Sequence, residues 1–266
     1  MKRSLRFLQL FLLLAIGAGP LRAQADAPKE EKKEKPPTRL RLLPIGDAPP
    51  HREEVVNGIR VHLPPPPGSI PPRTLAAWIN PETKVQWSPQ LGLLGQAVEL
   101  PRELQKIPLL DGQAPANAPP WLTVNLKASG EYLAVLTRGG KEPSWSSPAV
   151  VLLPDDAVAF PAGRVFLLNL APVEIPLQLG NEKFSLSPRS PVFRNPGAVS
   201  GLPLKATRPG SNQRQVFFHQ GELLLNPGER AMVIVYAADG IQARQPFKLL
   251  VMKERAPVAA PPAAVP

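Results

Sequence analysis

The chain alternates apolar and polar residues in many short runs that Pro and Gly interrupt. Typical runs are RLRLL at 39–43, WLTVNL at 121–126 and EYLAVLT at 131–137. A period of two residues is typical of β-strands that bury one face. A single helical turn is conceivable only near PRELQKI at 101–107. The pattern therefore predicts an all-β protein made of many short strands. Further strands are expected at 73–79, 91–100, 149–153 and 164–170, and in EIPLQLG, KFSLS, GLPLKA, QVFFH, ELLL, RAMVIVYA and FKLLVM.

One hairpin can be assigned from a single dipeptide. Asn57-Gly58 separates the two β-rich arms of EEVVNGIRVHL, residues 53–63. A two-residue hairpin turn of this type needs positive φ at both positions, which Asn and Gly tolerate better than other residues. We therefore expect a tight hairpin with its turn at these two residues.

Two similar strand–turn–strand units lie about a hundred residues apart. GEYLAVLTRGG begins at Gly130 and GERAMVIVYAADG begins at Gly228. In each unit a Pro that opens the next strand, Pro148 or Pro246, follows the Gly by 18 residues. The repetition predicts that Gly130 superposes on Gly228 and Pro148 on Pro246.

A second match lies upstream of each unit, where Arg39 aligns with Arg164. The first copy then holds about 27 extra residues, which we expect between residues 70 and 128. These observations predict two tandem immunoglobulin-like β-sandwich domains, 38–156 and 162–255, that arose by a diverged duplication. Each is long enough to bury its own core.

The first residues predict export from the cytoplasm. Residues 1–25 combine a basic start, an apolar stretch at 7–19, and Ala23 and Ala25 at the spacing of a signal-peptide cleavage site. We expect cleavage after Ala25 in preference to Ala23. An uncleaved anchor is the alternative, although a spanning helix needs about 20 apolar residues. The mature protein is expected to be soluble and extracytoplasmic, in the periplasm or outside the cell.

Composition adds constraints on the termini and on partners. The 37 Pro residues disfavour long helices. Residues 26–37 are expected to form a charged, Pro-flanked linker, and residues 256–266 are expected to form a disordered Pro/Ala-rich tail. The lack of Cys excludes disulfides and thiol chemistry. Removing residues 1–25, with four bases and no acids, lowers the formal charge from +10 to +6. This mild, scattered charge argues against a nucleic-acid partner.

No residue is predicted to be catalytic, to bind a cofactor or to bind a metal. His51, His62 and His219 stand in three separate sequence contexts, and His62 alternates with apolar neighbours as a solvent-facing strand residue does. Asp155 and Asp156 are expected to form a solvated linker turn, because adjacent residues on a strand point to opposite faces. The nucleophile-elbow, phosphate-loop and zinc-protease motifs are also missing, so we do not expect an enzyme.

The Trp residues offer the better candidates for a contact surface. Trp145 lies in the polar loop GGKEPSWSSP and Trp87 in KVQWSP, so both are candidate contact residues for a sugar ring or a partner protein. The alternative for Trp145 is that it folds back over the end of the sandwich. Trp78 and Trp121 lie in apolar strands and are expected in the core.

Residues 165–188, VFLLNLAPVEIPLQLGNEKFSLSP, carry a family resemblance. Their strand–Asn-x-Ala-Pro–strand–turn–strand order resembles the opening of small secreted bacterial β-sandwich domains of uncharacterised function. The resemblance covers about 162–255 and implies a fold and an envelope setting, without catalytic residues.

Together these observations predict a secreted, non-enzymatic binding or adaptor protein of the bacterial cell envelope, with an envelope protein or polysaccharide as its partner. The first alternative is a structural or assembly component that adds its exposed strands to a partner sheet. The second is a secreted hydrolase whose active site is assembled from distant residues.

Overall fold

The computed structural model describes residues 37–140, 144–210, 214–239 and 245–257. All regular secondary structure in these residues is β-strand, which confirms the predicted all-β class. Among the described residues, no helix has the length and apolarity needed to cross a membrane. The predicted signal peptide, linker and tail lie outside the described residues, except for residue 37 and residues 256–257.

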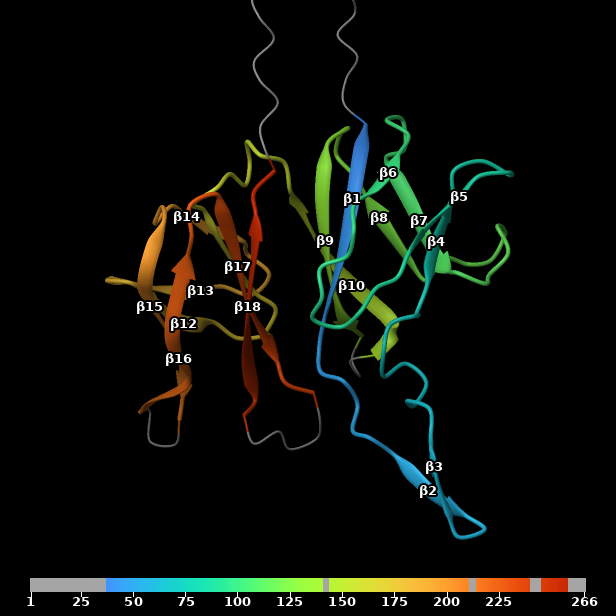
Figure 1. Ribbon diagram of the computed structural model, residues 1–266, viewed down its shortest axis with the longest axis horizontal. Coiled ribbons are helices and arrows are strands. Elements are labelled where there is room, and N and C mark those ends of the chain that lie inside the picture. The colour runs from blue at the N-terminus through green and yellow to red at the C-terminus, as the bar shows by residue number, and fades with distance from the viewer. Residues whose placement is uncertain (1–36, 141–143, 211–213, 240–244, 258–266) are drawn as a thin grey trace, which may run out of the picture. The chain divides into compact units, whose positions relative to one another are not determined.

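The first half of the chain forms two four-stranded sheets (Figure 1). Its strands are β1 (Thr38–Ile45), β4 (Leu75–Trp78), β5 (Lys84–Trp87), β6 (Val98–Leu100), β7 (Lys106–Asp111), β8 (Leu122–Asn125), β9 (Glu131–Gly139) and β10 (Ser144–Pro154). The first inner sheet has the order β10-β9-β1-β6, and the first outer sheet has the order β5-β4-β7-β8. A separate hairpin is formed by β2 (Glu53–Val56) and β3 (Ile59–His62).

The second half forms two more four-stranded sheets. Its strands are β11 (Val165–Asn169), β12 (Ile175–Leu179), β13 (Glu182–Leu186), β14 (Val192–Arg194), β15 (Val199–Pro209), β16 (Gln215–Leu225), β17 (Glu229–Ala237) and β18 (Phe247–Arg255). The second inner sheet has the order β14-β11-β17-β18, and the second outer sheet has the order β13-β12-β15-β16.

The two sandwiches have the same strand order. In each inner sheet the first strand of the half pairs in parallel with the strand before the last, β1 with β9 and β11 with β17. Each outer sheet consists of two hairpins. In the first sandwich β7 of the hairpin β7–β8 pairs with β4 of the hairpin β4–β5, and in the second sandwich β15 of β15–β16 pairs with β12 of β12–β13. Two copies of one ancestral sandwich are expected to share this order, and their common origin stays a prediction.

The predicted superposition of Gly130 on Gly228 is wrong by one residue. Leu133 and Met232 occupy the same kind of position, because both pack between the inner sheets. Leu133 lies three residues after Gly130, whereas Met232 lies four residues after Gly228. Aligning the glycines would place Leu133 on Ala231, which faces the opposite side of its sheet. A slip of one residue reverses the faces of a strand, so buried alternation is the better guide to register.

The final hairpins follow the same shift. Pro148 pairs with Arg138, and Phe247 pairs with Ala237. Arg138 lies five residues after Leu133, and Ala237 lies five residues after Met232, so Arg138 and Ala237 correspond to each other. Phe247, and not Pro246, is therefore the counterpart of Pro148.

The two inner sheets pack against each other through an apolar layer, which we call the shared layer. It is formed by Leu43, Ile45, Leu133, Val135, Leu153, Phe160, Phe166, Leu168, Met232 and Ile234. The other faces of the same strands pack against the outer sheets. On β1, for example, Leu40 and Leu42 belong to the core of the first sandwich. The central strands are thus buried on both faces, which explains why their sequences are almost continuously apolar.

A cluster of four charged residues links the two sandwiches. Arg41 of β1 donates hydrogen bonds to Asp155, at 2.6 and 2.8 Å, and to Glu254 of β18, at 2.6 and 2.9 Å. Arg230 of β17 donates to the same two carboxylates, at 2.7 and 2.9 Å. Its guanidinium also lies 4.4 Å from the ring centroid of Phe160. Each carboxylate therefore bridges one Arg of each sandwich.

This arrangement corrects the prediction for Asp155. The residue is buried, not part of a solvated turn, whereas Asp156 accepts hydrogen bonds from the N–H groups of Val158 and Ala159. The two adjacent carboxylates thus have different partners. Asp155 is needed because Arg230 is only 2 % exposed, and a buried guanidinium requires a nearby carboxylate.

The cluster also lowers the pKa of Glu254. Burial raises the pKa of Glu254, but the hydrogen bonds and charges of Arg41 and Arg230 outweigh burial and leave the pKa below its ordinary value. A carboxyl group with a lowered pKa stabilises the folded state above its ordinary pKa. We therefore expect this contribution to be lost as the pH falls through the lowered value.

Asp155→Ala should lower the free energy of unfolding by about 3–5 kcal/mol, because it leaves buried charge without its partner. Chemical denaturation monitored by Trp fluorescence measures the change. The control is Glu99→Ala, which removes the partner of Arg39 at an exposed ion pair and should cost less than about 1 kcal/mol. Equal, small losses in both variants would show that the cluster does not stabilise the fold.

Candidate functional site

The β2–β3 hairpin is the first candidate for a functional surface. Asn57 and Gly58 have φ values of 53° and 79°, so the predicted two-residue turn is confirmed. The strands pair from Val56 with Ile59 to Glu53 with His62. Every residue of both strands is exposed. In Figure 1 the hairpin lies apart from the four larger sheets.

The hairpin belongs to an insertion that distinguishes the two sandwiches. The first two sandwich strands of the first half, β1 and β4, are separated by residues 46–74, whereas their counterparts β11 and β12 are separated only by residues 170–174. Most of the extra length of the first half therefore lies here. The predicted place for it, between residues 70 and 128, was wrong because the counterpart of the β12–β13 hairpin is β4–β5, and the earlier β2–β3 hairpin has no counterpart in the second half.

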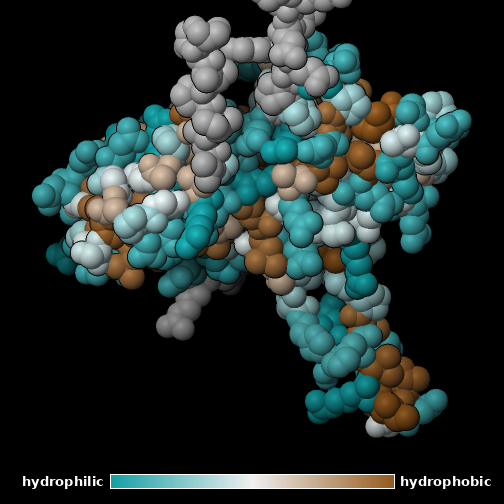
Figure 2. All heavy atoms as spheres, turned by 45° about the horizontal axis from the view of Figure 1, so that its top comes forward, coloured by the Kyte–Doolittle hydropathy of each residue, from teal (hydrophilic) through white to brown (hydrophobic). Residues whose placement is uncertain are grey.

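One face of the hairpin is apolar. Strand alternation and pairing place Val56, Ile59 and Val61 on this face, beside Glu54. The three apolar side chains are 45 %, 67 % and 44 % exposed. Figure 2 shows the corresponding group of hydrophobic atoms at the hairpin. Because these three residues are adjacent on one face, they form a contiguous apolar patch, and such a patch is a candidate contact surface.

The opposite face carries two of the three histidines. His51 Nε2 lies 3.2 Å from Glu53 Oε1, and His62 Nδ1 lies 3.5 Å from the same oxygen. The prediction that the histidines occupy separate contexts is therefore wrong for these two. The turn folds β3 back on β2, so residues eleven apart in the sequence become neighbours. His219 lies elsewhere, on β16.

The N-terminal end of the insertion is held by the second sandwich. Asp47 accepts hydrogen bonds from Tyr236 Oη at 3.1 Å, from Lys248 Nζ at 2.8 Å and from the N–H of Asp239 at 3.0 Å. The N–H of Asp47 in turn donates to Asp239 Oδ2 at 2.7 Å. Asp239 also pairs with Arg138 of β9. This group of contacts fixes where the chain leaves β1 toward the hairpin.

The C-terminal end of the insertion is held by the first sandwich. The N–H of Trp145 in β10 donates to the carbonyl of Gly68 at 2.9 Å. Gly68 has a φ of +72°, and a Cβ there would lie 2.5 Å from Ser144 Oγ, so the close approach requires Gly. Residues 65–73 line a hollow together with Trp121 and Trp145. The Pro-rich segment thus packs beside these two Trp side chains.

The two Trp residues predicted as a contact surface are buried. Trp145 is 1 % exposed and Trp87 is 4 % exposed, and both belong to the core of the first sandwich. The indole of Trp87 donates to the carbonyl of Leu40 at 3.0 Å, and Trp121 donates to the carbonyl of Trp145 at 2.6 Å. The polar sequence around Trp145 suggested a loop, but the residue continues β10 and lies under the returning insertion. Neither indole can serve as an exposed platform.

The other two Trp residues lie nearer the surface than predicted. Trp78 and Trp121 are partly buried. The ring of Trp121 stacks on that of Trp145, with the ring centroids 6.3 Å apart. Lys84 Nζ lies 5.4 Å from the ring centroid of Trp78.

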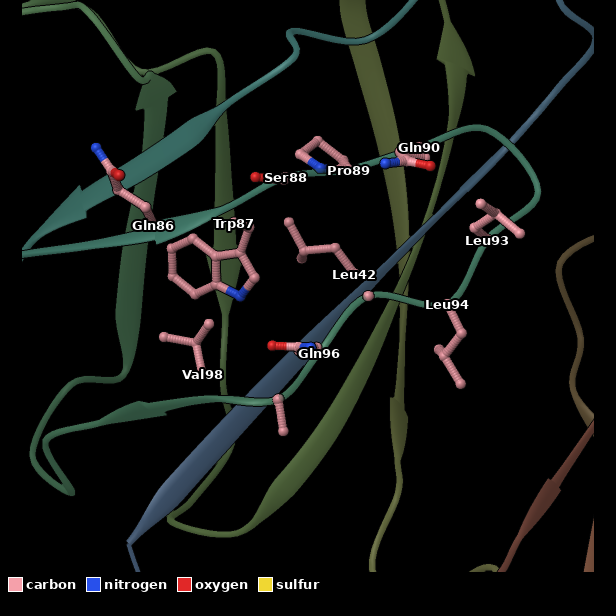
Figure 3. Close-up of a pocket in the computed structure, with 12 residues that line it drawn as sticks. Leu42, Gln86, Trp87, Ser88, Pro89, Gln90, Leu93, Leu94, Gln96 and Val98 are labelled. Carbon is pink, nitrogen blue, oxygen red and sulfur yellow. The ribbon is translucent and has the colours of Figure 1, made fainter.

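A hollow of about 470 Å³ lies where the chain leaves β5 (Figure 3). Its lining joins the apolar side chains of Leu42 and Val98 and the indole of Trp87 to the polar side chains of Gln86 and Gln96. The lining also contains the Ser88 hydroxyl but no acidic or basic side chain that could activate it. These groups can form hydrogen bonds with a neutral ligand, and they do not supply acid–base chemistry.

No protein-family model matches the chain, and none of the curated proteins matches it. The resemblance to secreted bacterial sandwich domains accordingly stays a prediction.

Trp145→Ala should lower the free energy of unfolding by about 3–5 kcal/mol, the usual cost of emptying a buried aromatic site. Chemical denaturation followed by far-ultraviolet circular dichroism measures the loss. Val158→Ala is the control, because Val158 is 85 % exposed and its truncation should change stability by no more than about 0.5 kcal/mol. A Trp145 variant as stable as the control would restore Trp145 as an exposed contact residue.

Tyr236 should ionise at unusually high pH. Burial, with the charge of Asp47 and its hydrogen bond, raises the pKa of Tyr236 to about 12. The unfolded value is about 10, so the folded state holds this proton more tightly and the free energy of unfolding should fall as the pH rises between the two values. The chain has two Tyr residues, so the phenolate absorbance of the native chain minus that of Tyr236→Phe isolates this group. A midpoint near 10 in protein that circular dichroism shows to be folded would contradict the contact with Asp47.

Proposed function

We propose that the protein is a secreted, non-enzymatic binding or adaptor protein of the bacterial cell envelope, and that it docks on a partner protein through the apolar face of the β2–β3 hairpin. The observation that carries this proposal is the exposure of Val56, Ile59 and Val61 on a hairpin that the second sandwich lacks. Within the described residues, β2 pairs only with β3.

The chemistry of the hairpin favours a protein as the partner. An isolated two-stranded hairpin is only marginally stable in water, and added strands or a covering apolar surface stabilise it. The side chains on the apolar face are aliphatic, whereas sugar rings are usually bound against aromatic ones. Both Trp residues first considered for a sugar platform are buried. A polysaccharide partner is therefore less well supported than a protein.

The assembly alternative is favoured by a specific feature of the same hairpin. Each of its strands pairs on one side only among the described residues, so its outer edge can receive a strand from a partner sheet. Strand addition of this kind uses main-chain hydrogen bonds for affinity and alternate side chains for specificity. Docking and strand addition thus use the same hairpin. In docking the partner covers the apolar face, and in strand addition it pairs with the outer edge.

The envelope setting rests on residues 1–25, whose basic start, apolar stretch and Ala23–Ala25 spacing support export. The measurement that tests it is the mass of the N-terminal peptide in protein from the producing cell. A mature end at Asp26 or Gln24 supports the proposal, and an intact Met1 contradicts it.

A photo-reactive residue at position 61 should cross-link to one partner protein in intact cells. The same probe at Val158, which is also exposed, should not give this adduct. Adding Ile59→Ser to the probe at position 61 should reduce the adduct several-fold while stability stays within about 0.5 kcal/mol, because Ile59 is exposed. Docking of a protein on this face is contradicted if proteases do not digest the adduct. It is also contradicted if the probe at position 158 gives the same adduct, or if Ile59→Ser leaves the yield of the adduct unchanged.

A further inference from the structure

Two imidazoles and one carboxylate meet on the hairpin face opposite the apolar one. Glu53 Oε1 lies 3.2 Å from His51 Nε2 and 3.5 Å from His62 Nδ1. The two imidazole rings are in contact, with their centroids 4.6 Å apart. With one ligand atom taken from each residue, all three atoms lie within 4.8 Å of one another.

These separations suit a tetrahedral metal ion. Zinc binds His nitrogen and carboxylate oxygen at about 2.0–2.2 Å, which places neighbouring ligand atoms about 3.3–3.5 Å apart. The distances from Glu53 Oε1 to the two imidazole nitrogens, 3.2 and 3.5 Å, lie close to that spacing. The imidazoles can close the third side by rotating their side chains, because His51 and His62 are 66 % and 72 % exposed.

The backbone holds the three residues on one face. Glu53 and His62 are direct cross-strand partners, so the register of the hairpin fixes their proximity. The ladder continues one step beyond the strands, where the N–H of Leu63 donates to the carbonyl of Arg52 at 2.9 Å. This bond keeps the chain next to His51 in line with β3.

One neighbouring cation must share the carboxylate. Arg60 Nη1 lies 3.6 Å from Glu53 Oε2, the oxygen that does not face the histidines. The Arg60 side chain is largely exposed and can move away into water. Glu53 Oε1 therefore stays available to a metal ion.

We propose that His51, Glu53 and His62 bind a divalent transition-metal ion, and that zinc is the ion best suited to them. Imidazole nitrogens select zinc and its neighbours, whereas Mg²⁺ and Ca²⁺ prefer oxygen ligands. Two His and one carboxylate fill three of the four positions around zinc, and water or a group from another molecule fills the fourth. The site uses the face opposite the proposed docking surface and does not depend on that surface having a partner.

The proposal is tested by titrating the untagged mature protein with ZnCl₂ in a calorimeter and by following the His Cε1–H resonances. We expect one ion per chain, with the His51 and His62 resonances shifted and the His219 resonance unchanged. MgCl₂ at the same concentrations should produce no shift.

Matched substitutions assign the ligands. His62→Asn and His51→Asn should each weaken zinc binding at least about tenfold. Loss of a residue that only hydrogen-bonds a metal ligand already lowers metal affinity by about that factor. His219→Asn removes the third histidine, on β16, and should leave the affinity unchanged. His51 lies outside both strands, so its variant keeps the hairpin ladder even if replacement at position 62 weakens it.

The proposal is overturned if both hairpin variants bind zinc as tightly as the native chain, or if His219→Asn causes the loss. It is also overturned if the chain binds no zinc, or if Mg²⁺ at equal concentration displaces zinc from the site.

Discussion

The central strands of both inner sheets are buried on both faces, and the rest of the structure depends on that constraint. β1 places Leu42 against its own outer sheet and Leu43 against the other sandwich. A strand in this position has no solvent side, so its charged residues must be paired. Arg41 and Arg230 meet this requirement by sharing Asp155 and Glu254 at the edge of the shared layer.

The two sandwiches differ most in what they expose beyond their shared strands. Both have the same order of eight strands, and the largest difference is the insertion at 46–74. Its hairpin presents an apolar face on one side and two imidazoles on the other. The two sandwiches thus share a framework, and the insertion adds exposed apolar and metal-ligating side chains to the first of them.

The sequence predicts most strands and the exact hairpin turn, because alternation and the Asn57-Gly58 pair are local signals. It does not predict β7, where Pro108 interrupts the pattern and PRELQKI suggests a turn. It also misaligns the two sandwiches by one residue, because a glycine can shift along a turn, whereas the alternation of buried residues in a strand cannot shift by one. Within the candidate site, the meeting of His51 with His62 depends on cross-strand pairing that spacing alone does not reveal.

The burial of Trp145 shows the same limit for tertiary contacts. Its neighbours in GGKEPSWSSP are polar, so local composition indicates a solvent-exposed loop. The residue is covered because the Pro-rich segment 65–73 returns from a distant part of the chain. A long-range contact of this kind leaves no periodic signal near the residue that it buries.

The two ends of the insertion are fastened to different bodies. Asp47 is tied to Tyr236 and Lys248 of the second sandwich, and Gly68 is tied to Trp145 of the first. Any force that displaces the hairpin would therefore strain hydrogen bonds in both sandwiches, and not in the first one alone.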